Sequence, residues 1–294
     1  PALYNVDLVN PSKNILVFGA RSEVGSYLLP LLAQTGNSIY AFSRRESSPS
    51  DKQPVFWVRA SDFRNGSSMR DVEIPTVISL MPIWELPGYR DILESVRANN
   101  LVAFSSTSIL SKEFSSNARE RHIANLLQRG ENWIHDEFSS QRRRGLIFRP
   151  TMIYGGEKNQ NINRIKRIIK LMRFFILASN GEGLRQPVHA EDLAQLCCQC
   201  LENHRPTIRT MNLTGGETLQ YRTMIDRIFL SVGVPTRIIS IPHYLIRPLV
   251  QVLRYLPNYQ DITFEMLLRM NRDLCYDDQE AIDEFGWSPR TFQP

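Results

Sequence analysis

The stretch NILVFGARSEVGSYLL, residues 14–29, decides which fold this chain is expected to adopt. Residues 15–18 form a continuous apolar run, which is typical of a strand buried on both faces of a parallel sheet. Gly19 follows at once, Gly25 comes six residues later, and apolar residues then recur in a helical rhythm. Such a strand–turn–helix points backbone N–H groups and the positive end of a helix at one spot. That spot suits a pyrophosphate.

The glycine spacing is close to the fingerprint of dinucleotide-binding turns, but Ser22 stands where G-x-x-G-x-x-G has its central glycine. The stretch therefore has two interpretations, an ordinary strand–turn–helix or a dinucleotide-binding turn, and we favour the second. On that interpretation the cofactor contacts come from Gly19, Arg21, Ser22, Glu23, Val24 and Gly25.

Composition sets limits on the class of protein. With 294 residues and 42% hydrophobic content, the chain can bury a substantial core. Its net charge of +5 is spread along the sequence, which favours an anionic small ligand over nucleic acid. No apolar run reaches the roughly 18 residues that a membrane span needs, and the N-terminus shows no signal-peptide pattern. We therefore expect a cytoplasmic protein without stable membrane insertion.

Three of the four cysteines crowd one predicted helix, at Cys197, Cys198 and Cys200. Adjacent positions on a helix point in different directions, so these thiols cannot share a metal ion. We expect buried thiols in a reducing compartment and no metal site.

A second strand is predicted at residues 38–42, followed directly by Ser43, Arg44 and Arg45. In a doubly wound nucleotide-binding domain the end of this strand faces the adenine ribose, where an acid favours NAD and arginines favour NADP. Arg21 in the glycine turn adds a third cation. The alternative is a solvated basic loop, but the position of the arginines predicts NADP(H) in preference to NAD(H).

Further strands are predicted at residues 55–58, 76–81, 101–104 and 146–148, with a helix at 89–98. Strands that alternate with helices and short polar turns indicate an α/β fold with a doubly wound parallel sheet. The strand ends add expected cofactor contacts at Asp62, Phe63, Leu80, Ser105 and Pro150.

Beyond residue 151 the pattern of apolar and polar residues changes. Residues 162–177 read as a basic amphipathic helix, whose basic face can contact phosphates or a membrane surface, although simple solvation is the favoured interpretation. Later segments alternate apolar runs with proline and glycine breaks, and Phe264, Leu267 and Leu268 are expected in the core. We predict a smaller, mostly helical C-terminal lobe.

Five segments together resemble the extended short-chain dehydrogenases/reductases of the NAD-dependent epimerase/dehydratase family, here in an atypical form. They are the glycine turn at 15–25, FSSTS at 104–108, RPTMIYG at 149–155, GEGLRQPVHAEDLA at 181–194, and residues 273–289, which end in FGWSP. The resemblance implies a Rossmann domain of residues 1–155 plus about 186–213. It also implies a substrate lobe of about 156–185 and 214–294, and a nucleotide-sugar substrate.

The family's chemistry is hydride transfer with proton transfer by a tyrosine that a lysine supports, while a Ser or Thr binds the reacting oxygen. The resemblance maps the hydroxyl role onto Thr107, with Ser106 beside it. The following helix, predicted at 117–133, contains neither tyrosine nor lysine. Tyr154 and Lys158 do form a Y-x-x-x-K, but in a segment that in this family lies by the cofactor and substrate.

The missing pair leaves three hypotheses open. An NAD(P)-dependent reductase or epimerase can use another proton donor, with His122 and Tyr154 as candidates. A non-catalytic NADP(H)-binding sensor or scaffold needs no such donor. A nucleic-acid-binding module is disfavoured, because the basic residues are not interleaved with aromatics in a recognisable domain.

On the substrate side, the resemblance assigns Arg185 to the nucleotide diphosphate, since a planar guanidinium pairs with phosphate oxygens. A salt bridge at the lobe junction is the alternative role of Arg185, and Arg272 is a candidate assistant. His189 and Asp192 are expected to shape a helix start, with Asp192 as the cap. A second copy of the chain is a candidate partner, as a homodimer.

Overall fold

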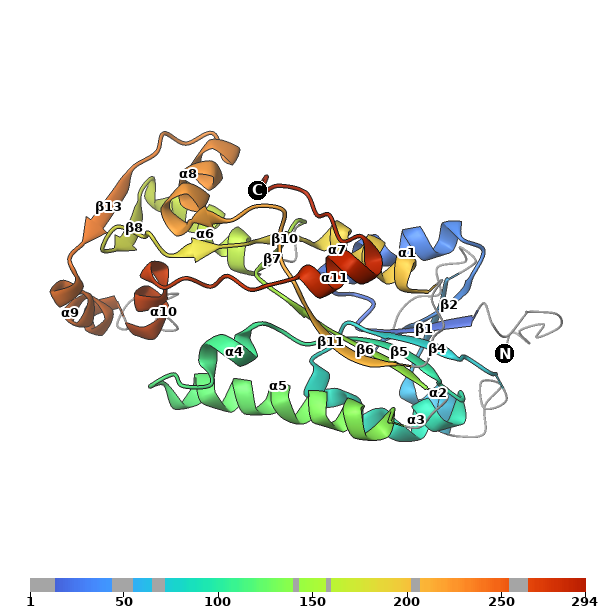
Figure 1. Cartoon of the computed structure of the whole chain (residues 1–294). Helices are drawn as coiled ribbons and strands as arrows, with labels where there is room; N and C mark the ends of the chain where they lie inside the picture. Colours follow the sequence, from blue (N-terminus) through green and yellow to red (C-terminus); the bar gives the residue numbers. More distant parts are fainter. Residues whose placement is uncertain are drawn as a thin grey trace.

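The computed structural model describes residues 14–43, 55–64, 72–139, 143–156, 160–201, 207–253 and 264–294. At its centre is a seven-stranded sheet in the order β11-β6-β5-β4-β1-β2-β3, in which every neighbouring pair is parallel (Figure 1). Its strands are β1 (Asn14–Phe18), β2 (Ser38–Phe42), β3 (Val55–Val58), β4 (Thr76–Ser79), β5 (Asn100–Phe104), β6 (Arg144–Pro150) and β11 (Ile208–Leu213). The predicted α/β class and parallel sheet are confirmed.

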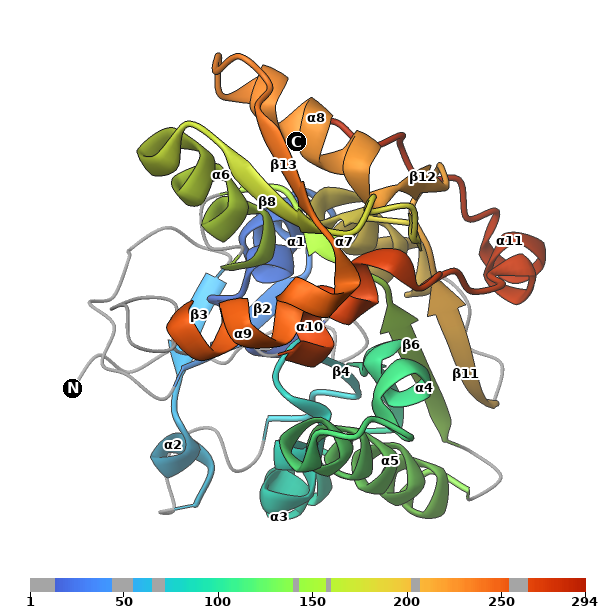
Figure 2. The ribbon, with the colours of Figure 1, turned by 90° about the vertical axis from the view of Figure 1, so that its left-hand side faces the viewer.

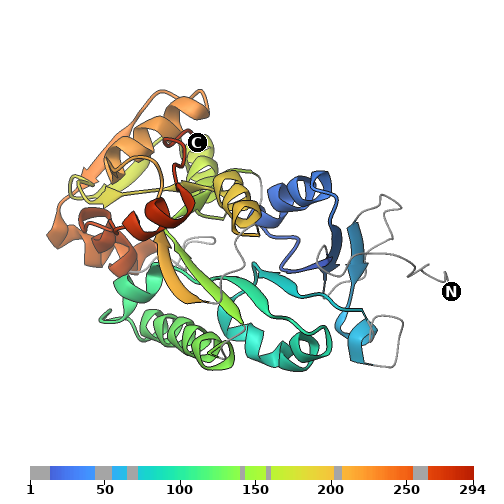
Figure 3. The same cartoon turned by 45° about the vertical axis from the view of Figure 1, so that its right-hand side comes forward.

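Helices cover both faces of the sheet, as Figure 3 shows. One face carries α1 (Glu23–Gln34), α7 (Ala190–Cys200) and α11 (Gln279–Phe285). The other carries α2 (Ala60–Arg64), the 3₁₀ helix η2 (Ile83–Tyr89), α3 (Arg90–Ser95), α4 (Ser108–Lys112) and α5 (Ala118–Glu137). The helix predicted at 89–98 corresponds to the shorter α3, and the one predicted at 117–133 corresponds to α5.

Strand β1 explains the continuous apolar run from which the fold was predicted. Ile15 and Val17 pack into the hydrophobic cluster beneath α1 and α7, whereas Leu16 and Phe18 pack into the cluster on the α5 face. Each such side chain contributes roughly 1.5–3 kcal/mol when fully buried. Both faces of the strand therefore demand apolar residues, and no polar alternation remains in the sequence.

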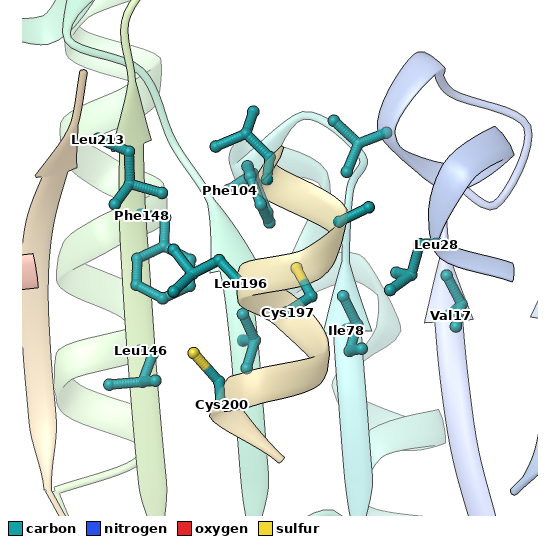
Figure 4. Packing of buried hydrophobic residues seen from close by; sticks show 14 of the residues in the cluster. Val17, Leu28, Ile78, Phe104, Leu146, Phe148, Leu196, Cys197, Cys200 and Leu213 are labelled. Atoms are coloured by element: carbon teal, nitrogen blue, oxygen red, sulfur yellow. The ribbon is translucent and has the colours of Figure 1, made fainter. Parts of the chain in front are cut away.

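Helix α7 packs its cysteines against the sheet. Figure 4 shows Cys197 and Cys200 among Ile78, Leu146 and Phe148, and both cysteines are buried. Burial raises the pKa of the Cys200 thiol to about 12 and that of the Cys197 thiol well above its usual value. These two thiols act as small apolar side chains, which confirms their predicted burial, while Cys198 is partly exposed.

The second lobe has its own core. It contains α6 (Gln160–Met172), β8 (Phe175–Ala178), α8 (Tyr221–Ser231), β13 (Ile238–Ile241), α9 (His243–Leu253), α10 (Phe264–Leu268) and the 3₁₀ helix η3 (Arg269–Asn271), which Figure 2 shows end on. Leu267 is buried there, and Phe264 and Leu268 pack against the cluster, as predicted.

The helix predicted at 162–177 is wrong in its last five residues, 173–177. Helix α6 ends at Met172, Arg173 adopts a left-handed backbone with φ of 63°, and residues 175–178 form β8. The run FFILA lacks the polar positions of an exposed helix, and it pairs in parallel with β13. The basic amphipathic pattern itself holds for α6, where Ile162, Ile165 and Ile169 are buried.

Short strands carry the chain between the two lobes. β7 (Ile153–Tyr154) pairs with β10 (Val188–His189), and β9 (Leu184–Arg185) pairs with β12 (Leu219–Gln220). The predicted lobe boundary placed all of residues 214–294 in the second lobe. However, α11 returns to the first lobe, where Ala281 and Trp287 join the cluster under α7. Among the described residues, no helix combines the length and apolar character that crossing a membrane requires.

Candidate functional site

The glycine turn lies at the carboxyl end of β1, near the middle of the sheet. Gly19 has φ of 67°, and a Cβ there would lie 2.7 Å from the carbonyl carbon of Leu80. A Cβ on Gly25 would lie 2.4 Å from the carbonyl oxygen of Ala20. Both glycines are therefore required by the turn itself, because it packs backbone against backbone.

Ser22 occupies the position of the missing central glycine without strain. Its φ is −67°, which any L-residue adopts, and it is the N-cap of α1. Its side-chain oxygen accepts a hydrogen bond from the Gly25 N–H at 3.1 Å. The serine thus satisfies one of the free N–H groups at the helix start. Val24 is buried, and the Glu23 side chain packs against Gly156.

Arg21 lies at the outer side of this turn. Its guanidinium carbon is 4.8 Å from the centre of the Trp57 ring, a cation–π geometry that joins the turn to β3. Ser43 follows β2 and donates its N–H to the Val58 carbonyl at 3.0 Å. Arg44 and Arg45, the other two predicted cations, lie outside the described residues. Trp57 was predicted only as part of a strand, because a tryptophan in an apolar run reads as core.

Three further predicted cofactor contacts lie at strand ends of the same edge. The Asp62 carboxylate accepts hydrogen bonds from the Arg59 N–H at 2.8 Å and the Ser61 hydroxyl at 3.2 Å, so it stabilises the start of α2. Phe63 is buried in the cluster on the α5 face. The Leu80 N–H donates to the Phe18 carbonyl at 2.9 Å, which extends the β1–β4 pairing up to the glycine turn.

A buried ionic network lies below the end of β5. The Ser105 hydroxyl donates to the Glu131 carboxylate at 2.5 Å, and the Arg149 Nε donates to the same carboxylate at 2.8 Å. The Glu131 side chain is only 2% exposed. Because an unpaired buried charge is costly, this network ties α5 to β5 and β6. The hydroxyl of Ser105 is thereby engaged within the protein.

Thr107 is held at the junction of β5 and β6. Both its N–H, at 3.2 Å, and its hydroxyl, at 3.3 Å, donate to the Pro150 carbonyl. Thr107 is buried and begins α4. The neighbouring Ser106 hydroxyl accepts from the Ser108 N–H at 3.1 Å. The structure therefore brings Thr107 and Pro150 together.

Tyr276, from the segment between η3 and α11, reaches Thr107 from the second lobe. Its N–H donates to the Gln186 side-chain oxygen at 2.8 Å. Burial raises the pKa of its phenol, whereas interactions with the hydroxyls of Ser111 and Thr107, and the charge of Arg185, oppose that rise. The sequence analysis missed Tyr276, since no motif marks a tyrosine at that place.

The two predicted alternative proton donors lie elsewhere. His122 is on the exposed side of α5, whose buried side carries Ala124, Leu127 and Glu131. Tyr154 is buried, and its hydroxyl donates to the Thr291 carbonyl at 3.1 Å and accepts from the Gln293 N–H at 3.3 Å. Tyr154 therefore fastens the C-terminal segment, and neither residue contacts Thr107 among the interactions that the structure gives.

Arg185 is buried between the lobe segments. Its guanidinium donates to the carbonyls of Leu184 and Arg272, at 2.7 Å and 2.8 Å, and also to the carbonyl of Arg269. It also lies 5.2 Å from the centre of the Tyr221 ring. The exposed Arg272 contributes its carbonyl to this arrangement. Both predicted substrate residues therefore meet at one place, where Arg185 fixes the chain that leads to Tyr276.

A second ion pair joins η3 of the second lobe to α5 of the first. The Arg269 guanidinium contacts both carboxylate oxygens of Glu120, at 2.5 Å and 2.6 Å, and the Ser115 hydroxyl donates to the same carboxylate at 2.7 Å. Burial raises the pKa of the Glu120 carboxyl, but the hydrogen bonds from Arg269 and Ser115 outweigh it, and the net pKa is lowered. Burial and the charge of Arg269 lower the pKa of the nearby Lys112.

The cap predicted for α7 is wrong in its residue. His189 is the N-cap, and its Nδ1 accepts from the Glu191 N–H at 3.2 Å. Asp192 instead accepts from the backbone N–H and the guanidinium of Arg290, at 2.9 Å and 2.7 Å. The charged Arg290 guanidinium is a stronger hydrogen-bond partner for the Asp192 carboxylate than the backbone N–H groups of a helix start.

No family model matches the chain. Uncharacterized protein YbjS of Escherichia coli (strain K12) is 23% identical over 319 residues, covering 94% of this chain and 93% of YbjS. Among solved structures, UDP-N-acetylglucosamine 4-epimerase from Bacillus cereus has a TM-score of 0.66 at 16% identity, covering 95% of this chain and 92% of that one.

Two further solved structures align with a similar share of the chain. MoeE5 in complex with UDP-glucose and NAD has a TM-score of 0.65 at 17% identity, covering 95% of this chain and 94% of that one. dTDP-glucose 4,6-dehydratase from Bacillus anthracis, in complex with NAD, has a TM-score of 0.65 at 14% identity, with 95% and 92% covered. The chain therefore shares the Rossmann-type α/β fold of these epimerases and dehydratases over almost its full length.

Proposed function

We propose that this chain binds NADP(H) and acts as a reductase or epimerase on a nucleotide-sugar-like substrate. The observation that carries the proposal is the turn after β1, where Gly19 and Gly25 bring the backbone close and α1 begins. Free N–H groups and the positive end of a helix attract a pyrophosphate at such a turn. The solved structures of this fold with NAD bound support a nicotinamide dinucleotide at this turn.

The residues that are present fit a dinucleotide. Gly19 and Gly25 lack side chains at the two places where the turn packs backbone against backbone. Ser22 keeps its backbone in an ordinary conformation. Arg21 adds positive charge beside Trp57, at the edge where the adenine ribose is expected. An arginine there favours the 2′-phosphate of NADP over the 2′-hydroxyl of NAD.

The nicotinamide ring, when bound, exchanges a hydride with a carbon that carries oxygen. The chain's own part in the reaction centres on Thr107, which follows β5 and whose hydroxyl donates to the carbonyl of Pro150, the last residue of β6. In this proposal the Thr107 hydroxyl exchanges that hydrogen bond for one to the reacting oxygen, with Ser106 as its neighbour. The second lobe, through the segments 181–186 and 269–276, closes over the nucleotide sugar.

One experiment separates this proposal from its rival. Purified chain with bound NADPH is mixed in a stopped-flow instrument with a panel of UDP- and dTDP-4-keto sugars, and absorbance at the reduced nicotinamide band is followed. The proposal predicts oxidation with at least one sugar. No oxidation by any sugar, together with tight NADPH binding, contradicts it.

The rival function is a non-catalytic NADP(H)-binding sensor, and one observation favours it. Helix α5 contains neither tyrosine nor lysine, and Leu127 on its inner side is buried in the hydrophobic cluster. A sensor requires the glycine turn but no proton donor. The stopped-flow result described above therefore decides between the two functions, since both predict NADPH binding.

A further inference from the structure

We infer that Tyr276 supplies the phenolic hydroxyl that α5 lacks, and that it gives the proton to the substrate oxygen held by Thr107. The inference rests on the proposed reductase or epimerase function and names its proton donor. It requires that the fold hold a phenol near Thr107. Tyr276 reaches this position from the second lobe.

Hydrogen bonds fix the backbone that carries Tyr276. Residues 273–276 run beside residues 184–186: the Leu184 N–H donates to the Asp273 carboxylate at 2.9 Å, and the Leu274 N–H donates to the Leu184 carbonyl at 3.0 Å. The Tyr276 N–H then donates to the Gln186 side-chain oxygen at 2.8 Å. These three hydrogen bonds fix the position of the Tyr276 backbone.

Residues 184–186 lead to a segment that is itself anchored to the first lobe. The carbonyl of Gln186 accepts from the Thr151 hydroxyl, and the Val188 N–H donates to the Met152 carbonyl at 2.9 Å. Thr151 directly follows Pro150, whose carbonyl holds Thr107. Residues 150–151 and 186 therefore position both Thr107, in the first lobe, and Tyr276, in the second.

The phenol of Tyr276 interacts with polar groups of both lobes. The hydroxyls of Ser111 on α4 and of Thr107 at the start of α4 lower its pKa, and so does the charge of Arg185. Arg185 is buried and held by three carbonyls, so its charge stays in place. A fixed cation beside a phenol stabilises the phenolate that proton donation leaves, which is the task that a lysine has in the related enzymes.

The proton balance of the step is as follows. As the carbonyl carbon of a keto sugar is reduced, with a reduced nicotinamide nucleotide as the two-electron donor, the O–H bond of Tyr276 breaks and its proton passes to the sugar oxygen. The phenolate then recovers a proton from water. Ser111 and Thr107 keep their own protons throughout, so neither changes its charge.

The first test compares Tyr276→Phe with Tyr244→Phe, since Tyr244 is 76% exposed on α9 and serves as the matched control. Proton transfer by a positioned group contributes about 10²–10⁴-fold, so we expect Tyr276→Phe to slow NADPH oxidation by about 100-fold or more. The dissociation constant of NADPH, from fluorescence, should stay within about twofold of the wild type. A Tyr276→Phe rate within about threefold of the wild type overturns the inference.

The second test needs no turnover. Tyrosine labelled with ¹³C at Cζ gives one NMR resonance per phenol, and the resonance missing from Tyr276→Phe identifies Tyr276. Because the hydroxyls of Ser111 and Thr107 lower the pKa of this phenol, a Thr107→Val/Ser111→Ala variant should raise it measurably. The Tyr244 resonance should not respond. An unchanged Tyr276 titration contradicts the contact.

The two tests fail in different ways. If no sugar of the panel supports NADPH oxidation by the wild-type chain, the proposed function fails, and the inferred proton transfer is overturned with it. The NMR titration then still shows whether Tyr276 and Thr107 form a pair. If the wild type turns over and Tyr276→Phe does so equally well, only the inference fails.

Discussion

The guanidinium of Arg21 stacks 4.8 Å above the ring of Trp57, which couples the glycine turn after β1 to the third strand. This contact holds a positive charge at the sheet edge where a 2′-phosphate is expected. Such stacking contributes about 0.5–1 kcal/mol at an exposed site. Its larger effect is to restrict where the guanidinium lies.

We therefore expect Arg21→Ala to weaken NADPH binding by about tenfold and NADH binding by much less, since only NADPH carries the phosphate. Trp57→Leu should produce part of the same loss. Fluorescence titrations with both nucleotides measure the ratio, and Arg90→Ala on α3, an exposed arginine paired with Glu94, is the control. An equal loss for both nucleotides would remove the phosphate assignment. The same comparison on Arg44→Ala/Arg45→Ala tests the two arginines predicted from the sequence.

Ser22 is expected to stabilise the chain through its cap on α1. Ser22→Ala removes the acceptor for the Gly25 N–H and should lower the free energy of unfolding by about 1 kcal/mol. Ser22→Gly, which completes the G-x-x-G-x-x-G spacing, should cost only a few tenths of a kcal/mol. Urea denaturation of the three proteins gives the comparison. Equal stability of Ser22→Ala and the wild type would show that the cap contributes nothing.

Gly25 should tolerate no side chain, because a Cβ would lie 2.4 Å from the backbone oxygen of Ala20. The turn must shift to admit it, at a cost of about 2 kcal/mol in the free energy of unfolding. Gly88→Ala is the matched control, since a Cβ there meets nothing within 4 Å. Thermal unfolding of both variants measures the difference. A Gly25→Ala variant as stable as Gly88→Ala would contradict the close approach.

The Glu120–Arg269 ion pair should make stability depend on acid pH. The folded carboxyl has a lowered pKa, so its contribution is fully present above the unfolded value of about 4.5 and is lost as pH falls through the folded value. Glu120→Gln should destabilise the chain by about 3 kcal/mol at pH 7 and by progressively less in acid. Glu73→Gln is the control, because Glu73 pairs with Arg97 at the exposed surface. A pH-independent difference between wild type and Glu120→Gln contradicts this account.

The fold was predictable because its signals are local. The apolar run at 15–18 is buried on both faces of β1, and the absence of any polar residue in the run indicated this directly. The seventh strand, β11, was not predicted as a strand, because IRTMNL lacks the continuous apolar run of the central strands. It lies at the edge of the sheet, next to β6. Residues 175–178 read as helix because β8 depends on pairing with β13, more than 60 residues later.

The candidate site was predictable only where one segment defines it. The positions of Gly19 and Thr107 followed from the segments that contain them. The contact of Tyr276 with Thr107 joins residues from two lobes, and no spacing in the sequence indicates it. Tyr154 shows the converse, because its Y-x-x-x-K spacing suggests catalysis while its hydroxyl binds the backbone of residues 291 and 293.

The central claim is that the N–H groups after β1 hold the phosphates of a dinucleotide although Ser22 replaces the central glycine. Isothermal titration calorimetry of the purified chain with NADPH and with NADH tests it most directly. The account predicts one NADPH bound per chain, more tightly than NADH. Heat of binding from neither nucleotide at millimolar concentration would contradict the claim and leave the fold alone standing.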